Sequence, residues 1–157
     1  MHDPIERLEL SHGHLSELVL RVGRLLRDSA GRPLAPTADQ RTQIFVLLET
    51  LRDELLQHFA DEEEALFPFV RGAVPSRSAA VDALETSHDA ICGSVVRLAH
   101  LAGHGAAWQP LPLYERFERA YAEHSRDEAN LLEDLAATLD DKSRKELTEH
   151  LRGISSR

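Results

Sequence analysis

The chain has 157 residues, which is long enough for one domain with a sizeable buried core. Its formal net charge of −9, with no basic cluster, argues against nucleic-acid binding, and no apolar run approaches the roughly 20 residues that a membrane-spanning helix needs. The single cysteine, Cys92, cannot form an internal disulfide, and residues 1–14 lack the apolar stretch of a signal peptide. We therefore expect a cytoplasmic protein that does not contact a membrane.

Glycine and proline gather in three segments, which are the predicted loops: 29–36, 72–76 and 103–112. The segments between these loops are rich in Leu, Ala, Glu and Arg, a composition that favours helices. The predicted core helices span about 4–29, 38–72, 77–103 and 112–138, and a short terminal helix spans about 141–152.

Thr37 and Ser76 are predicted N-caps, and Pro68 is expected to bend or end the second helix. Short loops between four long helices favour antiparallel neighbours. The sequence therefore predicts a single all-α domain over residues 1–157, an antiparallel up-down-up-down four-helix bundle with a short C-terminal helix.

Within each predicted helix, apolar residues recur at alternating spacings of three and four, the pattern of helices packed in a bundle. The inward positions are apolar or aromatic except at six, which carry an imidazole or a carboxylate: His12, His58, Glu62, His88, His124 and Glu128. An isolated buried carboxylate is strongly unfavourable unless it is protonated, paired or bound to a metal ion. We therefore expect these six side chains to face one another or a cation.

The phrase LELSH, which ends at His12, returns as LETSH, which ends at His88. Helix packing accounts for repeated Leu and Glu, but a histidine repeated in the same register needs another explanation. With a rise of about 1.5 Å per helical residue, antiparallel neighbours bring all four inward histidines to nearly one level. The sequence thus predicts one layer of imidazoles across the bundle.

Two of the predicted helices share the spacing His-x-x-x-Glu, at His58 with Glu62 and at His124 with Glu128. This spacing places both side chains on one face of a helix, one turn apart. Four imidazoles and two carboxylates suit two metal ions, with each glutamate bridging them beside a shared oxo or hydroxo group. Imidazole with carboxylate favours iron or manganese and does not exclude zinc.

The stretch HFADEEEALFP (58–68) resembles the His-Phe-x-x-Glu-Glu-x-x-Leu-Phe-Pro phrase of the hemerythrin-like family, the HHE cation-binding domains. The stretch SHDAICGSVVRLAHLA (87–102) is similar to the third helix of the di-iron proteins associated with repair of damaged iron-sulfur clusters. The resemblance covers about residues 4–139. It implies a non-haem di-iron centre in a four-helix bundle, with the six inward residues as its ligands.

Two departures from the family pattern shape the expected function. Oxygen-carrying hemerythrins have a histidine where this chain has Cys92, so the resemblance implies four histidines in place of five and irons that are not coordinatively saturated. This favours redox chemistry on O₂, NO or peroxide over reversible oxygen storage. The cluster-repair proteins also have an amino-terminal cysteine-bearing domain that we do not expect here, so the resemblance to them concerns the ligand set.

Four further residues are candidates to act beside the ligands. Tyr121, one turn before an inward histidine, either donates a hydrogen bond to an oxygen species at the metal or is a core aromatic. Cys92 is an additional ligand, a redox partner or, as we favour, a small apolar filler. Glu9 and Glu85 either accept from the outer nitrogen of an imidazole or lie on the surface. The acids of 61–64 other than Glu62 are predicted to form a solvated face.

The leading functional hypothesis is a cytoplasmic di-iron protein that binds or reduces O₂, NO or H₂O₂, with electrons supplied by a donor protein. One alternative is an iron or oxygen sensor without turnover. The other is a structural bundle stabilised by zinc.

Overall fold

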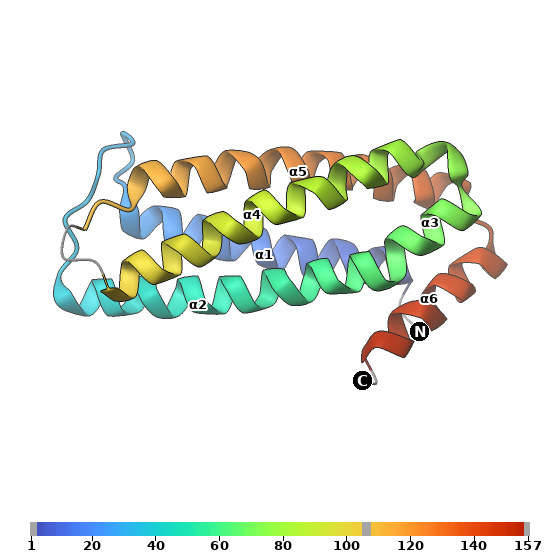
Figure 1. Cartoon of the computed structure of the whole chain (residues 1–157), viewed down its shortest axis with the longest axis horizontal. Coiled ribbons are helices and arrows are strands. Elements are labelled where there is room, and N and C mark those ends of the chain that lie inside the picture. The colour runs from blue at the N-terminus through green and yellow to red at the C-terminus, as the bar shows by residue number, and fades with distance from the viewer. Residues whose placement is uncertain (1–2, 105–107, 156–157) are drawn as a thin grey trace.

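The computed structural model describes residues 3–104 and 108–155, and within these ranges the chain is helical with no strand (Figure 1). Its elements are α1 (Pro4–Leu26), α2 (Ala38–Asp61), a π-helical turn (Glu62–Leu66), α3 (Phe67–Ala73), a 3-10 turn (Pro75–Arg77), α4 (Ser78–His104), α5 (Leu111–Thr138) and α6 (Asp141–Ser155). The predicted all-α class is confirmed. Among the described residues, no helix has the length and apolar character needed to cross a membrane.

Four rods lie side by side in Figure 1: α1, α2 with its extension α3, α4, and α5. Helix α1 packs against α2 and α5, and α4 packs against the same two helices, so the rods form a closed ring. The chain reverses direction at each connection between rods, as the short loops predict. Helix α6 covers one end of the ring, where it contacts α1, α3 and the π-helical turn.

Three helix ends differ from their predicted positions. The first helix ends at Leu26 instead of 29 because Arg27 adopts an extended backbone conformation. Ser76 is not an N-cap: it lies inside the 3-10 turn, and α4 begins at Ser78. The final helix extends to Ser155, beyond the predicted 152. Residues 105–107, in the middle of the third predicted loop, lie outside the described residues.

Thr37 is the N-cap of α2, as predicted. Its hydroxyl accepts from the Gln40 backbone N–H at 3.2 Å, and the Gln40 side chain accepts from the Thr37 backbone N–H at 2.9 Å. This reciprocal pair satisfies two of the N–H groups that a helix start leaves without an intrahelical partner.

Replacing Thr37 by alanine is expected to lower the free energy of unfolding by about 1 kcal/mol, because the cap hydrogen bond is lost. Urea denaturation measures the change. The matched control is Thr50→Ala in the exposed middle of α2, where the hydroxyl bonds only to the Val46 carbonyl oxygen of its own helix. That substitution should change the free energy of unfolding by less than about 0.5 kcal/mol. The loss of the hydroxyl contact is offset because alanine has the higher helix propensity. Equal losses in the two variants would contradict the capping role.

Pro68 does not end the second predicted helix, which continues to Ala73. Pro68 lies in the first turn of α3, where the missing N–H costs little. The irregularity precedes it: the N–H of Phe67 bonds to the carbonyl oxygen of Glu62, five residues earlier, which widens this turn by one residue.

The wide turn rotates the following residues relative to the regular pattern. Leu66, Phe67 and Val70 are buried in addition to the expected Ala65 and Phe69, so α3 has more than one buried side. Helix α6 covers the added side with two leucines of the same hydrophobic cluster, Leu147 and Leu151. The sequence predicts that a terminal helix packs these two leucines onto the bundle, but the spacing in 62–69 predicts only one buried side there.

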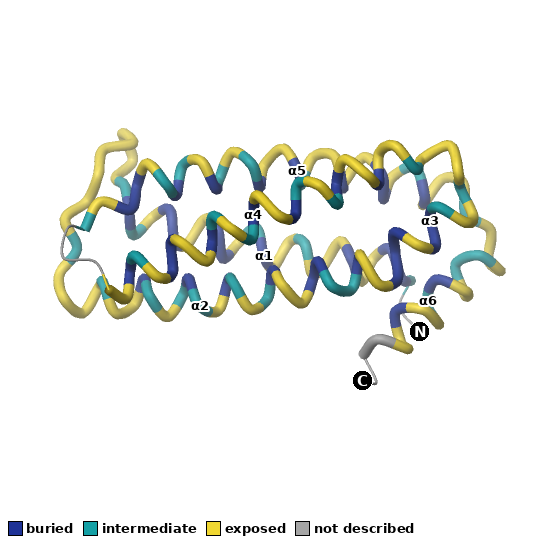
Figure 2. The backbone as a smooth tube through the Cα atoms, in the orientation of Figure 1, coloured by how far each residue is buried: buried dark blue, intermediate teal, exposed yellow. Residues whose placement is uncertain are grey.

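The inward positions of all four rods are buried, as the dark segments of Figure 2 show, except His12, which is partly exposed. The apolar core forms two separate clusters. One fills the end near the α1–α2 loop and includes Val22, Leu48 and Tyr114. The other fills the end covered by α6 and includes Leu66 and Leu135. The imidazole and carboxylate layer lies between them.

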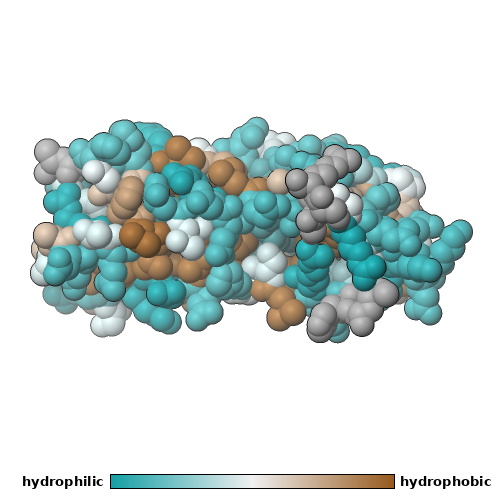
Figure 3. All heavy atoms as spheres, turned by 90° about the horizontal axis from the view of Figure 1, so that it is seen from below, coloured by the Kyte–Doolittle hydropathy of each residue, from teal (hydrophilic) through white to brown (hydrophobic). Residues whose placement is uncertain are grey.

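The outer surface is mainly hydrophilic on the face shown in Figure 3, with separate groups of hydrophobic side chains. The large exposed hydrophobic residues are spread over several parts of the chain: Leu10, Leu20, Leu34, Val46, Leu56 and Val96. Scattered apolar side chains of this kind are normal on protein surfaces.

Candidate metal centre

The six inward imidazoles and carboxylates come from all four rods. His12 lies on α1, His58 on α2, Glu62 at the first position of the π-helical turn, and His88 on α4. The last two, His124 and Glu128, lie one turn apart on α5. Five of the six residues are buried, with at most 3% of each exposed, and 16% of the His12 side chain is exposed. The His-x-x-x-Glu spacing thus delivers both of its side chains to the interior, as predicted.

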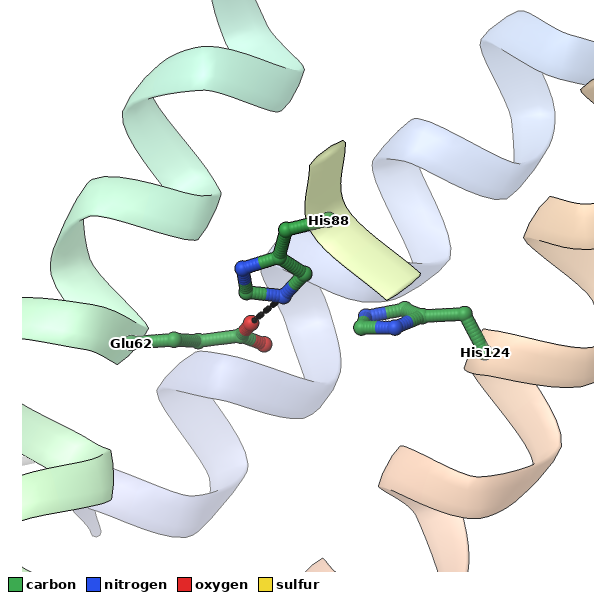
Figure 4. Close-up of side chains that lie close together, drawn as sticks. All are labelled: Glu62, His88 and His124. Atoms are coloured by element: carbon green, nitrogen blue, oxygen red, sulfur yellow. Dashed lines mark ion pairs between the residues drawn. The ribbon is translucent and has the colours of Figure 1, made fainter. Parts of the chain in front are cut away.

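Glu62 lies between histidines of different rods. One carboxylate oxygen, Oε1, is 2.9 Å from Nε2 of His58, and the other, Oε2, is 2.9 Å from Nε2 of His88. Figure 4 shows this carboxylate pointing at His88, with the ring of His124 turned towards the same space. The ligand atoms of Glu62, His88 and His124 lie within 4.8 Å of one another, close enough to hold one metal ion.

Glu128 occupies the corresponding place on the other side of the layer. Its Oε1 is 3.3 Å from Nε2 of His58, and the two form a second ligand group with Glu62, again within 4.8 Å. The other oxygen, Oε2, is 3.3 Å from Nε2 of His124 and 3.5 Å from Nε2 of His12. His12 therefore contacts the carboxylates of the layer at Glu128. Both carboxylates lie between the α1–α2 pair of helices and the α4–α5 pair.

The donor atoms of this layer are buried without hydrogen bonds. Among the described residues, ten buried side-chain nitrogen and oxygen atoms have no hydrogen-bond partner. Eight of them are the Nε2 atoms of the four histidines and both oxygens of the two glutamates. Their distances of 2.9–3.5 Å are close approaches without hydrogen-bond geometry. Buried polar atoms are otherwise almost always satisfied, so this donor set fits metal ions between them.

The outer nitrogens of three histidines are held by named partners. The Ser11 hydroxyl lies 3.0 Å from Nδ1 of His58, and the Ser87 hydroxyl lies 2.6 Å from Nδ1 of His124. A carboxylate oxygen of Glu63 lies 2.7 Å from Nδ1 of His88. Such contacts fix the orientation and tautomer of an imidazole and direct its other nitrogen at a metal.

Glu9 and Glu85, the two glutamates considered for this role, do not hold an imidazole in the structure. Glu85 forms an ion pair with Arg71, at 2.5 Å, instead of holding an imidazole, and Glu9 is exposed on α1. Glu63 was expected on a solvated face, yet it contacts His88 from its partly exposed position. The roles of Ser11 and Ser87 were not predicted, although the sequence indicates them. Each serine directly precedes the histidine of the repeated LELSH and LETSH phrases.

Aromatic rings form the wall around the layer. Phe59 stacks on His88 with 3.7 Å between ring centroids, and Phe67 stacks on the same imidazole at 5.5 Å. The Tyr121 ring stacks on His12 at 5.9 Å, while its hydroxyl lies 3.2 Å from the Ser16 hydroxyl. The rings restrict imidazole rotation and exclude water from this side.

Cys92 belongs to neither ligand group. It is half-buried and packs against the hydrophobic cluster near the α1–α2 loop. Burial raises the pKa of its thiol, which keeps it protonated and apolar. These properties favour the filler role over metal ligation.

Protons are distributed unequally over the layer in the metal-free protein. Burial and the nearby Glu128 carboxylate raise the pKa of Glu62 well above its usual range. Burial also acts to raise the pKa of Glu128, but contacts with Glu62 and the surrounding imidazoles lower it well below that range. Burial acts to lower the pKa of His58, and the two carboxylates reverse this and raise it to about 10. Burial and His124 lower the pKa of His88 to about 3.

Metal binding is therefore expected to release protons and to weaken as the pH falls. At pH 7 His58 is protonated in the metal-free protein, because 7 lies below its pKa of about 10, and a metal ion must displace that proton. As the pH falls through the raised pKa of Glu62, this carboxylate takes up a second proton that a metal ion must displace. His88 is already neutral and has no proton to release from its Nε2. Titration calorimetry in buffers of different ionisation enthalpy should show release of about one proton per chain or more at pH 7. Proton-neutral binding between pH 6 and 8 would contradict this distribution.

The fold and the layer together define a class: a four-rod helical bundle with a buried imidazole-carboxylate site suited to metal cations. Residues 3–136 match the hemerythrin family, described as the hemerythrin HHE cation binding domain. The chain belongs to this family. Searches of curated proteins and of solved structures gave no match.

Proposed function

We propose that the protein is a non-haem di-iron protein that binds or reduces a small ligand, namely O₂, NO or peroxide, with a donor protein supplying electrons. The family is one of cation-binding domains, and the buried His and Glu groups offer the ligands for it. The single observation that carries the proposal is the set of eight buried, unsatisfied donor atoms in one layer.

In this proposal each helix pair holds one metal ion. His12 and His58 would ligate the ion of the α1–α2 pair, His88 and His124 would ligate the ion of the α4–α5 pair, and the two glutamates would bridge them. This assignment agrees with Glu62, whose two oxygens approach His58 of one pair and His88 of the other. It also agrees with Glu128, which approaches histidines of both pairs. A di-iron pair supplies two one-electron couples and coordination positions for a small ligand.

The protein side chains have their own part in the proposal. The stacked phenylalanines keep the site dry and the imidazoles fixed, and the serine and glutamate partners hold the outer nitrogens. The proposed setting is a reducing cytoplasm, which is supported by the single half-buried cysteine.

Anaerobic loading with Fe²⁺, followed by exposure to air, tests the proposal. We expect uptake of two iron ions per chain and the appearance of charge-transfer absorption of a ferric pair. Subsequent addition of peroxide or NO to the reduced protein should change the spectrum and show turnover with an electron donor.

The alternatives predict different results in the same experiment. A sensor would show the spectral change with little turnover. A structural zinc bundle would retain zinc after purification and show no ferric absorption after iron loading, which would overturn the proposal.

A further inference from the structure

The two helix pairs hold their ligands in the same pattern. In α1–α2, the residue before His12 is Ser11, and it contacts His58 on the other helix of the pair. In α4–α5, the residue before His88 is Ser87, and it contacts His124 on the other helix of its pair. The repeated Ser-His phrase thus supplies one ligand and the outer partner of another in each half.

The pattern is broken at one place. Glu63 follows the bridging Glu62 and contacts Nδ1 of His88 at 2.7 Å. The corresponding residue after Glu128 is Ala129, which has no polar side chain. Within the part of the chain that the structure describes, Nδ1 of His12 has no hydrogen-bond partner.

The same two histidines differ in their surroundings. His88 is 2% exposed and lies against the ring of Phe59, at 3.7 Å between ring centroids. His12 has a side chain that is 16% exposed, and its aromatic neighbour Tyr121 lies at 5.9 Å. His88 is therefore held by charge, hydrogen bond and packing, whereas His12 is held mainly by its approach to Glu128.

A carboxylate behind an imidazole has two effects on a metal bound in front of it. It fixes the tautomer, with the proton on Nδ1 and the lone pair on Nε2, and it makes the imidazole a stronger donor. A serine hydroxyl supplies the orientation without the negative charge. His88 receives both effects and His12 receives neither.

We propose that Glu63 is a positioning residue that makes the two metal positions inequivalent, so that the position held by His88 and His124 binds its ion more tightly than the position held by His12 and His58. This inference rests on the proposed function, because it requires two bound ions. The metal position held by His12 and His58 is then the last to take up its ion and the first to lose it. Small ligands are expected to exchange at this ion.

The test is an anaerobic titration of the full-length chain with Fe²⁺ against a chromophoric chelator. The wild-type protein should bind in two steps whose affinities differ by about 10–100-fold, the usual effect of an outer partner on metal affinity. In Glu63→Gln the tighter step should weaken by about 10-fold or more, so that the two steps approach each other. Glu63 is 42% exposed, so this variant keeps its buried core.

Ser11→Ala is the matched variant for the other position, because it removes the partner of His58. It should weaken the weaker step and widen the gap, which is the opposite of the effect of Glu63→Gln. A spectroscopic readout is independent of affinity: Mössbauer spectra of ⁵⁷Fe²⁺-loaded wild type should show two distinct iron environments that become more alike in Glu63→Gln.

Two equal steps in the wild-type protein, or an unchanged gap and unchanged spectra in Glu63→Gln, would overturn this inference while leaving the proposed function intact. Failure of the wild-type protein to bind any Fe²⁺ would instead overturn the proposed function, and this inference with it.

Discussion

Replacing Glu62 by glutamine is expected to abolish the binding of both metal ions. The Glu62 oxygens approach His58 of one helix pair and His88 of the other, so this carboxylate is shared between the two proposed metal positions. A neutral amide removes the bridging charge from both. The affinity should fall by more than the roughly 10–100-fold effect of losing an outer partner. Chelator competition with Fe²⁺ measures the loss.

The same substitution is expected to stabilise the metal-free protein. Burial raises the pKa of Glu62, so the folded state binds its proton more tightly than the unfolded state does. At a pH above the pKa that Glu62 has in the unfolded chain, ionisation of Glu62 therefore favours unfolding. This destabilisation disappears as the pH falls to that pKa. Glutamine carries no such charge, so metal-free Glu62→Gln should be at least as stable at pH 7 as metal-free wild type.

Glu64→Gln is the matched control, since Glu64 lies in the same π-helical turn with its side chain exposed. It should bind iron as the wild type does. Wild-type affinity in Glu62→Gln, or a comparable loss in Glu64→Gln, would contradict the role assigned to Glu62.

Removal of the metal ions is expected to lower the melting temperature by about 15–30 °C. A ligand present at a thousand times its Kd stabilises the folded state by about 4 kcal/mol, so two ions contribute about 8 kcal/mol. For a chain of this length, each kcal/mol changes the melting temperature by about 2–4 °C. The physical cause is the layer itself, in which eight buried donor atoms lack hydrogen bonds.

Differential scanning calorimetry before and after chelation measures this shift. Metal-free Glu62→Gln serves as the control, because a chelator should not change its melting temperature. A wild-type protein that melts at the same temperature with and without chelator would show that the layer is stable without cations.

Periodicity in the sequence predicts the rods and their buried faces because long amphipathic helices have few alternative ways to pack. It also indicates the six inward residues, since an imidazole or carboxylate at an apolar position stands out. His12 illustrates the limit of this reasoning. Its position on the inward face is predictable, but the spacing does not indicate that 16% of its side chain is exposed.

The features that the sequence did not predict, namely the π-helical turn and the partners of His88 and Glu85, involve tertiary contacts. The π-helical turn after Asp61 lies against α6, which also contacts α3. The pairing of Glu63 with His88 crosses 25 residues of sequence, so no local pattern predicts it. The ion pair of Glu85 with Arg71 likewise joins residues 14 positions apart.

The metal content of the protein, purified without added metal and measured by elemental analysis, tests the central claim most directly. The account predicts two metal ions per chain, mainly iron, and their loss in Glu62→Gln. A folded wild-type protein with much less than one ion per chain, or with a full complement retained in Glu62→Gln, would contradict it.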